Sequence, residues 1–389
     1  MRILVPEAHA MGSIACIRSL GRAGHTVLAC STDAQALGFR SSFCHESHRV
    51  PAEATPSEYR AWLLGLVTSR QIDLVLPSEG VFAAFGDEIT TLADRLPVGP
   101  DPLAAQRFAN KYALFECFLQ ADDSALREHL PATVLLDRGT DLALAIGRVG
   151  LPCFAKFDAA PESQLGATVQ RIDNVAAGMP RLAARLERHG RGILQGFSPG
   201  CGVGVFFLRW GGRVLATLMH RRLHEVPHTG GASSLRETWW DEDLHADALR
   251  RIHAMSWSGV GMLEYRWQGP GSYELMEFNA RFWGSLHLAL AAGVDFPRLL
   301  VEAWSGKAVR PVAGRPGVRC RLTFPNELEY LLSLLRDGNV SLLGKLGALA
   351  ETVALSLNPA VHSDLWFPGD RGLYFRALSR TPAKFLRRH

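Results

Sequence analysis

The sequence predicts a mixed fold in which an α/β part comes first, an α+β part follows, and a helical extension ends the chain. Three observations predict this order. Short apolar runs alternate with helix-like segments over the first hundred residues. Strand-like runs joined by glycine-containing turns follow, as in a small antiparallel α+β module. From about residue 313 onward, apolar residues recur at helical spacing, which predicts amphipathic helices over 326–336 and 342–357.

Length and composition indicate a compact protein of two or three domains, since the chain has 389 residues and an average apolar content. The net charge of +4 comes from mixed charges spread along the chain, so nucleic acid is not an expected partner. Seven scattered cysteines without a CxxC pair favour a reducing compartment. We therefore expect a cytoplasmic protein, with neither an export signal nor a transmembrane segment.

Residues 1–100 are expected to form a parallel α/β domain. Its predicted elements are strands at 3–5, 26–30 and 72–77 and a helix over 12–23. The turn around residues 8–15 sits where a dinucleotide-binding loop would lie, but it lacks the GxGxxG glycines. A nicotinamide-dependent oxidoreductase is therefore only a weak hypothesis. A proline-rich cluster at 97–102 predicts the first domain boundary.

Residues 101–312 are expected to form the second domain, with a central lid-like part at about 131–200. Lysine is rare in this chain, so Lys111 and Lys156 stand out. Lys156 lies in an apolar strand-like run, where an unpaired ammonium would be costly, so we expect it to face a partner or a cleft. A phosphate oxygen would suit it. Lys111, taken alone, would pass for an ordinary helix-surface lysine.

Residues 313–389 form the predicted C-terminal extension, which ends in an aromatic, proline-containing and finally basic tail. The tail either packs on the body of the protein or touches an acidic membrane surface. The shortness of its basic run favours packing. Whether the extension shapes a substrate site or a dimer contact is left open by the sequence.

The segment 260–281 predicts a β-hairpin with a glycine-proline turn. Side chains two apart on a strand share a face, so Glu277, Asn279 and Arg281 would point the same way. If the turn is symmetric, Glu264 lies directly across from Glu277. Two facing carboxylates repel each other unless positive charge lies between them, and a divalent cation would resolve the conflict.

Carboxylate and amide oxygens are the ligands that Mg²⁺ prefers, which fits Glu264, Glu277 and Asn279. Arg281 would then neutralise charge on a transferring phosphoryl group. The alternative is a surface strand whose charges are solvated. Apolar residues between the polar positions argue against it, because they imply that the strand is at least half buried.

The stretch 220–234 combines adjacent arginines with histidines, paired glycines, serine and threonine. It predicts a flexible loop that closes over phosphate or a substrate carboxylate. An exposed hairpin end with solvated charges is the alternative. Its histidine spacing matches no recognised zinc pattern. The candidate loop residues are Arg221, Arg222, Glu225, Thr229, Gly230, Gly231 and Ser233.

The order of these features resembles the ATP-grasp superfamily, in particular its carboxylate-amine ligases, and is similar to the ATP-grasp domains of the carbamoyl phosphate synthase large chain. The resemblance covers about residues 1–310. It rests above all on Glu277-Phe-Asn279-Ala-Arg281, which is similar to the Glu-x-Asn-x-Arg signature of the superfamily, and on the continuation at 291–297. It implies a Rossmann-like pre-ATP-grasp domain followed by a two-subdomain ATP-grasp fold.

The resemblance also implies the cofactors, ATP and Mg²⁺, with Mn²⁺ as an alternative ion. It implies that Glu264, Glu277 and Asn279 hold the metal and that Arg281 is catalytic. The residues implied to bind ATP are Lys111 and Lys156 at the phosphates and Gln195, Gly196 and Phe197 at the adenine. From the sequence alone, residues 193–197 would offer strand-edge amides to an adenine ring, as any β-strand edge would.

The sequence departs from the superfamily pattern in four places. Ala280 stands where proline usually follows the signature asparagine, and Gly196 replaces a common acidic residue of the hinge. Residues 201–204 lack the acid that binds ribose in many relatives, and residues 157–163 replace a glycine-rich phosphate loop. These departures concern nucleotide affinity and loop geometry more than the metal site.

The leading hypothesis is therefore an ATP-dependent ligase that activates a carboxylate as an acyl phosphate and couples it to an amine or another nucleophile. Its partners would be small-molecule substrates, and a homodimer stays open. The alternative is a catalytically inactive ATP-binding protein with a regulatory or scaffold role. The identities of the acid and the nucleophile do not follow from the residues.

Overall fold

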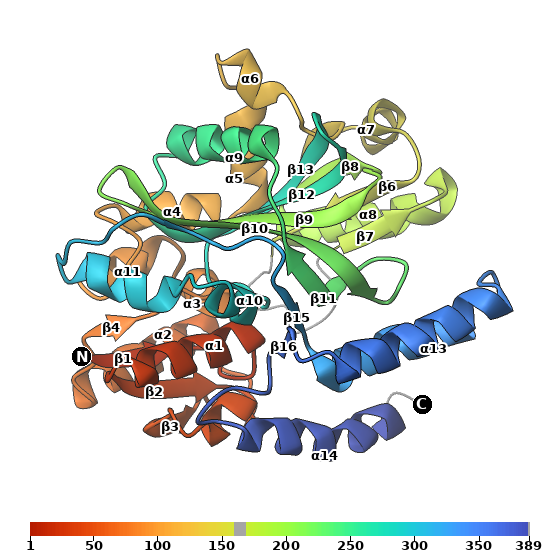
Figure 1. Ribbon diagram of the computed structural model, residues 1–389. Helices are drawn as coiled ribbons and strands as arrows, with labels where there is room; N and C mark the ends of the chain where they lie inside the picture. Colours follow the sequence, from red (N-terminus) through yellow and green to blue (C-terminus); the bar gives the residue numbers. More distant parts are fainter. Residues whose placement is uncertain (159–168, 388–389) are drawn as a thin grey trace.

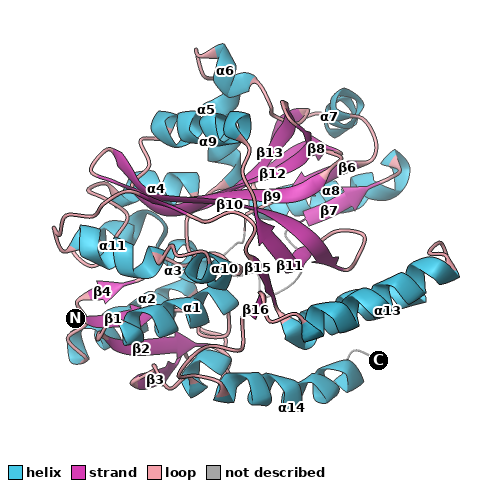
Figure 2. Ribbon diagram, in the orientation of Figure 1, coloured by secondary structure: helices cyan, strands magenta, loops and turns pink. Residues whose placement is uncertain are grey.

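The computed structural model describes residues 1–158 and 169–387, and their strands form three sheets (Figures 1 and 2). The first sheet is parallel, with the order β3-β2-β1-β4. Its strands are β1 (Arg2–Val5), β2 (Thr26–Ser31), β3 (Glu46–Arg49) and β4 (Leu74–Val75), and its helices are α1 (Met11–Arg22), α2 (Pro56–Ser69) and α3 (Glu79–Phe85). This is the predicted N-terminal α/β unit. The strand expected at 72–77 is shorter, since only Leu74 and Val75 pair with β1.

Helix α1 connects this first sheet to the rest of the molecule. It contacts α10 (Leu286–Ala291) and α11 (Phe296–Trp304), and its apolar face shares one core with Trp283 and Phe296. A Cβ atom on Gly12 would lie 2.6 Å from the Trp283 carbonyl oxygen, so only glycine allows this approach. The N-terminal domain is thereby held against the segment that follows the predicted hairpin.

The second sheet has eight strands and lies at the centre of the molecule (Figure 1). Its order is β13-β12-β9-β10-β11-β15-β16, with β14 pairing with β10. The strands are β9 (Cys201–Trp210), β10 (Arg213–Val226), β11 (Ala232–Thr238), β12 (Gly259–Gly269), β13 (Ser272–Asn279), β14 (Val312–Ala313), β15 (Arg319–Arg321) and β16 (Val361–Ser363). Gly211 and Gly212 form the β9–β10 turn with φ values of 55° and 78°, as the predicted hairpin turn requires. Four helices lie beside this sheet (Figure 1), namely α4 (Pro102–Phe108), α5 (Lys111–Leu119), α6 (Ser124–Arg127) and α9 (Glu242–Ala254).

The third sheet is antiparallel and has the order β5-β8-β6-β7. Its strands are β5 (Thr133–Asp137), β6 (Cys153–Lys156), β7 (Val169–Ile172) and β8 (Arg191–Gly196), and its helices are α7 (Leu142–Val149) and α8 (Val175–His189). It has its own small core and lies within the residues predicted to form the lid-like part. The domain boundaries themselves stay a prediction.

The C-terminal extension contains the predicted helices, namely α12 (Leu328–Arg336), α13 (Leu342–Leu357) and α14 (Gly372–Arg387), but it also adds the strands β15 and β16 to the central sheet, which the sequence did not predict. Helix α13 begins and ends at the residues that the apolar spacing indicated, because Ser341 accepts a hydrogen bond from the Gly344 N–H and caps its first turn. In the described parts of the chain, no helix is both long enough and apolar enough to span a bilayer.

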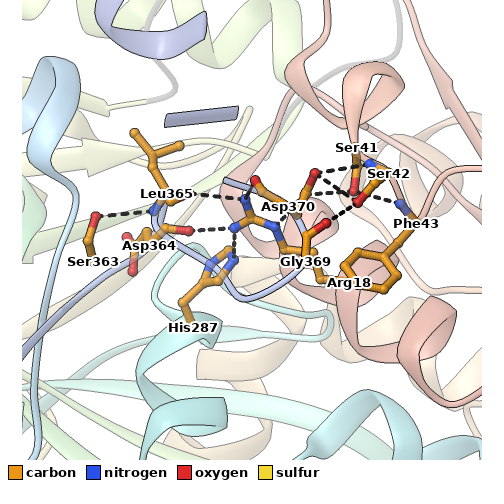
Figure 3. A network of polar contacts seen from close by, with 10 residues as sticks. All are labelled: Arg18, Ser41, Ser42, Phe43, His287, Ser363, Asp364, Leu365, Gly369 and Asp370. Atoms are coloured by element: carbon orange, nitrogen blue, oxygen red, sulfur yellow. Dashed lines mark hydrogen bonds and ion pairs between the residues drawn. The ribbon is translucent and has the colours of Figure 1, made fainter. Parts of the chain in front are cut away.

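A buried polar network ties this extension to the N-terminal domain (Figure 3). Arg18, on α1, is fully buried and donates to an Asp370 carboxylate oxygen at 2.8 Å and to the Asp364 carbonyl oxygen at 2.5 Å. Its guanidinium also lies 2.9 Å from Nε2 of His287 on α10. Ser41 donates to the same Asp370 carboxylate at 2.8 Å. Three parts of the chain that are distant in sequence therefore share one buried cation.

Candidate active site

The β12–β13 hairpin brings Glu264 and Glu277 into direct register, as the sequence predicts. The pairing is less regular than a symmetric turn would give. One register shift falls between Trp267 and Gly269 and another between Glu264 and Tyr265. The two shifts offset each other, so the two carboxylates still face across the hairpin, where paired Cβ atoms are about 5 Å apart.

Asn279 and Arg281 continue from Glu277 at the end of β13. The Asn279 amide donates to a Glu277 carboxylate oxygen at 3.1 Å, which places both side chains on one face of the strand. Arg281 lies just beyond the last strand residue and donates to Glu79 at 2.9 Å. Glu79 is the first residue of α3, so Arg281 reaches from the central sheet to the N-terminal domain.

Positive charge reaches the two carboxylates from within the chain. Arg222, on β10, lies 2.6 Å from a Glu264 carboxylate oxygen and 3.3 Å from Glu225. The buried Lys156 ammonium donates to the Met276 carbonyl oxygen at 3.4 Å, next to Glu277. Repulsion between the carboxylates is therefore relieved without a metal ion, so the case for a metal rests on the ligand chemistry and not on the repulsion that the sequence suggested.

Arg222 reaches Glu264 across the intervening strand β9, which lies between β10 and β12. Glycine at position 202 makes this possible. A Cβ atom there would lie 2.8 Å from the Arg222 side chain and 2.8 Å from the Glu225 carboxylate. The glycine-containing run at 201–204, which departs from the superfamily pattern, thus leaves space for a pair of charges.

The site perturbs the pKa values of its ionisable groups in different directions. Burial lowers the pKa of Lys156 to about 8, against the opposing effect of Glu277 and then Glu264. Burial raises the pKa of Glu264, although Arg222 opposes the shift. Burial acts in the same direction on Glu277, but Lys111 and Lys156 outweigh it and bring its pKa below the usual range. Glu277 is therefore the carboxylate that stays ionised most readily.

Lys111 approaches the same region from α5. Asn110 caps this helix by accepting from the Ala113 N–H at 2.9 Å, which makes Lys111 the first helical residue. Asp158 accepts a hydrogen bond from the Lys111 backbone N–H at 2.9 Å and lies 3.9 Å from its ammonium. Burial raises the pKa of Asp158 while Lys111 opposes the rise. Sequence reasoning missed Asp158, because a lone aspartate beside an apolar strand carries no recognisable pattern.

Two neighbouring cavities open at this site. The first, here named the lysine cavity, has a volume of about 310 Å³ and is lined by residues that include Lys111, Asp158, Asn279 and Arg281. The second, named the sheet-edge cavity, has a volume of about 540 Å³. Its lining includes Glu7, His9, Ser78, Glu79 and Arg281. Arg281 and Glu79 line both cavities, so they stand at the junction.

The sheet-edge cavity lies where ligands usually bind in open parallel sheets. It is lined by residues that follow the carboxyl ends of β1 and β4, at the point where the strand order reverses. Glu7 adopts a left-handed backbone with φ of 54° and accepts from the Gly80 N–H at 2.7 Å. A non-glycine residue in that conformation is costly and marks candidate functional positions. The turn at 8–15 thus borders a cavity, although its glycine pattern excluded a dinucleotide fingerprint.

The predicted loop at 220–234 is mostly a pair of strands, which corrects the prediction. Strand β10 runs to Val226 and β11 begins at Ala232, so Arg221, Arg222 and Glu225 lie in β10 and Ser233 lies in β11. The connection between the strands holds only Thr229, Gly230 and Gly231 from the candidate set. Arg221 pairs with Glu237 at 2.8 Å, on the neighbouring strand. The charged residues of β10 obscured the alternation of apolar and polar residues that identifies a strand, because they pair with charged residues on neighbouring strands.

The predicted adenine hinge also needs correction. Strand β8 is central in its sheet, between β5 and β6. Its backbone amides are therefore used in pairing with these two strands and do not form a free edge. The Gln195 side chain is fully buried and donates to Thr133 at 3.1 Å, and the Gly196 N–H donates to Ala132. Only Phe197, just past the strand, is exposed. The phosphate-loop departure after Phe157 falls largely on residues 159–168, which lie outside the described residues.

The donor set at the hairpin fits a hard divalent cation. Two facing carboxylates and one amide oxygen lie together, and Mg²⁺ usually combines one or two carboxylates with phosphate and water. Lys111 and Lys156 supply two ammonium groups near these carboxylates, as their joint effect on Glu277 indicates. The arrangement therefore suits a metal-bound polyphosphate between the hairpin and the third sheet.

Comparison with known proteins agrees with this geometry. Residues 194–323 match the family model described as "ATP-grasp in the biosynthetic pathway with Ter operon". Comparison with curated protein sequences gives no match.

Several solved structures resemble the chain over most of its length. The biotin carboxylase complex with β-γ-ATP from Campylobacter jejuni is 14% identical, covers 79% of this chain and 71% of its own, and has a TM-score of 0.59. N5-carboxyaminoimidazole synthetase from Staphylococcus aureus with ADP is also 14% identical. The match covers 82% of this chain and 80% of the synthetase, with a TM-score of 0.60.

A third structure is the biotin carboxylase domain dimer of Hydrogenobacter thermophilus 2-oxoglutarate carboxylase, with MgADP and bicarbonate, which is 11% identical. The match covers 82% of this chain and 73% of that domain, with a TM-score of 0.62. The resemblance to the ATP-grasp superfamily is therefore confirmed, and this chain has the ATP-grasp fold.

Proposed function

We propose that the chain is an ATP-dependent ligase that activates a carboxylate as an acyl phosphate and joins it to an amine, with release of ADP and phosphate. The observation that carries the proposal is the position of Arg281. It lies at the junction of the lysine cavity and the sheet-edge cavity, two residues beyond the carboxylate-amide set of the hairpin. A phosphoryl group passing from one cavity to the other would pass this guanidinium.

In this proposal the ATP phosphates bind beside Lys111 and Lys156, and Glu264, Glu277 and Asn279 hold Mg²⁺, with Mn²⁺ as an alternative. When bound, the ion would neutralise phosphate charge and align the γ-phosphoryl group. The structures of relatives with a β-γ-ATP ligand and with MgADP support a nucleotide in this fold. The adenine would lie near the exposed Phe197, since Gln195 is buried.

The substrate acid would occupy the sheet-edge cavity, where Arg281 and Ser78 offer donors to a carboxylate. An oxygen of that carboxylate attacks the γ-phosphorus, the bond to the bridging oxygen breaks, and ADP leaves. The amine nitrogen then attacks the acyl carbon, the carbon–oxygen bond to phosphate breaks, and the amine gives up its proton. Arg281 would stabilise charge on the transferring group, and binding both reactants in adjoining cavities would supply much of the rate.

A second candidate is a catalytically inactive ATP-binding protein. One observation favours it: Arg222 lies 2.6 Å from Glu264 and neutralises a carboxylate that would otherwise hold the metal. In a working ligase, Arg222 must share Glu264 with the ion or turn toward Glu225, which it already contacts. We further infer a cytoplasmic location, where seven free cysteines are compatible with the reducing environment, while a homodimer stays a prediction.

The test is Mg²⁺-dependent ADP release over a panel of small carboxylic acids, with hydroxylamine present to trap an acyl phosphate as its hydroxamate. The expected result is one acid class that gives ADP and hydroxamate in equal amounts, with both lost in Glu277→Gln. Glu274→Gln, on the same strand, is the matched control and should retain activity. ATP binding without ADP release for any acid would favour the inactive candidate instead.

A further inference from the structure

Helix α13 exposes an apolar stripe that faces away from the molecule. Leu342, Leu343 and Leu357 are 73%, 82% and 78% exposed, which is unusual for leucine in a folded chain. The stripe comprises Leu342, Leu343, Leu346, Leu349, Val353 and Leu357, and is named the α13 stripe. From Leu343 onward its members recur at spacings of three and four residues, and Leu342 lies four residues before Leu346, so they share one face of the helix. Scattered apolar residues on a surface are ordinary, but five leucines and a valine on one face form a patch that marks an interaction site.

The other side of α13 accounts for its attachment to the body. Ala348 and Leu355 are its buried residues, and the helix contacts α12. A helix needs only one apolar stripe to dock on its own protein. The α13 stripe is therefore a second apolar face, in excess of what packing on the body requires.

Helix α14 and the segment just before it present a second exposed apolar group beside basic residues. Leu373 and Ala377 are buried against the body, while Trp366, Phe375 and Leu378 are exposed. The Trp366 ring lies 6.0 Å from the Phe375 ring, and the Arg371 guanidinium lies 4.9 Å from the centre of the Trp366 ring. Figure 1 shows α13 and α14 extending toward the same side of the molecule. Exposed tryptophan and phenylalanine beside arginine are typical of membrane-interface positions.

Charge identifies the kind of surface that this end of the molecule fits. Residues 338–389 contain seven Lys and Arg but only three acids, namely Glu351, Asp364 and Asp370. Asp364 and Asp370 are buried against Arg236 and Arg18, so they do not offset the basic surface. Four of the basic residues, Lys345, Arg371, Arg376 and Arg380, belong to the part of the chain whose side chains the structure describes, and the other three, Lys384, Arg387 and Arg388, are counted from the sequence alone. The segment is thus both apolar and cationic.

We propose that the C-terminal extension is a membrane-docking surface that binds anionic phospholipid through the α13 stripe and the exposed side chains of Trp366, Phe375 and Leu378. Leucines and aromatic rings would enter the interface between headgroups and acyl chains, and the basic residues would bind anionic headgroups. Helix α13 has 16 residues, which is too short to span a bilayer but suits a helix lying in the interface plane.

A second copy of the chain is a less suitable occupant. A two-fold contact places the same patch on both sides, so it would bring the basic residues of both copies together. An anionic lipid surface, in contrast, attracts the basic residues that lie near it. The sequence favoured packing of this tail because its basic run is short, but among the described side chains the extension also carries Lys345 on α13, Arg371 just before α14, and Arg376 and Arg380 on α14.

Vesicle co-sedimentation of the whole chain tests the proposal. Wild type should sediment with vesicles of phosphatidylcholine and phosphatidylglycerol and stay in solution with phosphatidylcholine alone, and added salt should weaken binding. The triple variant Leu342→Ser, Leu346→Ser, Val353→Ser should bind about tenfold or more weakly, because it removes apolar side chains from the interface. Its melting temperature should not fall, since these residues are exposed. Leu144→Ser, an exposed leucine on α7, is the matched control and should bind like wild type.

Two outcomes would overturn the proposal. The first is wild type that stays in solution with anionic vesicles at low salt. The second is a triple variant that binds as well as wild type, which would mean that the basic residues alone adsorb the protein. If light scattering shows a wild-type dimer that the triple variant loses, while vesicles bind neither protein, the occupant of the stripe is a second copy. Ligase activity does not enter these readouts, so they are independent of the proposed function.

Discussion

Arg281 and Glu79 form an ion pair of 2.9 Å between residues that are 202 positions apart in the chain. The pair joins the end of the β12–β13 hairpin to the first turn of α3, and both residues line the two cavities of the candidate site. Glu79 holds a flexible guanidinium at the place where a phosphoryl group would pass. The carboxylate thereby acts on the proposed reaction through Arg281.

Arg281→Met should reduce hydroxamate formation by about a hundredfold or more, because a charge that stabilises the transferring group is lost. ADP binding, measured by calorimetry, should change far less, since the two lysines remain. Glu79→Gln should lower kcat by a smaller factor. Equal losses of nucleotide affinity and kcat in Arg281→Met would assign the arginine to ground-state binding.

Asn279→Ala should abolish Mg²⁺-dependent ADP release while leaving the fold intact, because it removes the amide oxygen of the proposed metal site and the hydrogen bond to Glu277. The measurement is ADP release across a Mg²⁺ titration, with circular dichroism to follow the fold. A variant with wild-type turnover and an unchanged Mg²⁺ requirement would remove Asn279 from the metal site.

Nucleotide affinity should fall as the pH rises through about 8. The pKa of Lys156 is lowered to about 8 by burial, so its charge is present below that pH and lost above it. If phosphate binding needs the ammonium, ADP affinity should drop about tenfold between pH 7 and pH 9. Titration calorimetry measures this, with Lys156→Arg as the comparison, since arginine stays charged over that range. The same slope in both proteins would mean that another group titrates.

Removing the Arg222 charge should destabilise the protein, because Glu264 would lose its closest cation in a buried setting. We expect Arg222→Met to lower the free energy of unfolding by about 3 kcal/mol in urea titrations. Combining it with Glu264→Gln should recover part of the loss, as the uncompensated carboxylate is then absent. Additive effects of the two substitutions would show that the pair does not interact.

The His287 imidazole should make stability fall in acid. Burial lowers its pKa to about 3, although Asp364 opposes the shift, while the unfolded value is about 6.5. A histidine with a depressed folded pKa contributes stability above 6.5 that is lost as the pH falls toward 3, by about 3 kcal/mol at pH 4. The free energies of unfolding of wild type and His287→Gln, measured by urea titration, should therefore differ less in acid than at neutral pH. A constant difference between them would exclude the imidazole as the titrating group.

The sequence predicted those parts of the site that depend on local chain geometry. The facing pair Glu264 and Glu277 follows from one short turn, and Asn279 follows from strand periodicity. The contact between Arg222 and Glu264 requires knowing that β9 lies between their strands and that Gly202 leaves room. Strand order and side-chain reach of this kind are not encoded in any local pattern.

The two corrections have the same physical origin. Residues 220–226 look like a loop because their charged side chains mask the strand alternation, and those charges are compensated by partners on other strands, such as Glu237 and Glu264. Residues 193–196 look like an available edge because the sequence does not tell a central strand from an outer one. In both segments, the pairing with strands distant in the sequence determines the structure, and this pairing cannot be read from the local residues.

The bond between Arg18 and Asp370 spans 352 positions of the chain. During synthesis the first helix leaves the ribosome long before its buried guanidinium can meet the aspartate that neutralises it. Until nearly the whole polypeptide has been made, this arginine therefore stays hydrated at the surface of the N-terminal part or is bound by a chaperone. Premature termination before residue 370 would release a chain in which Arg18 lacks the carboxylate that neutralises it and lies exposed to water.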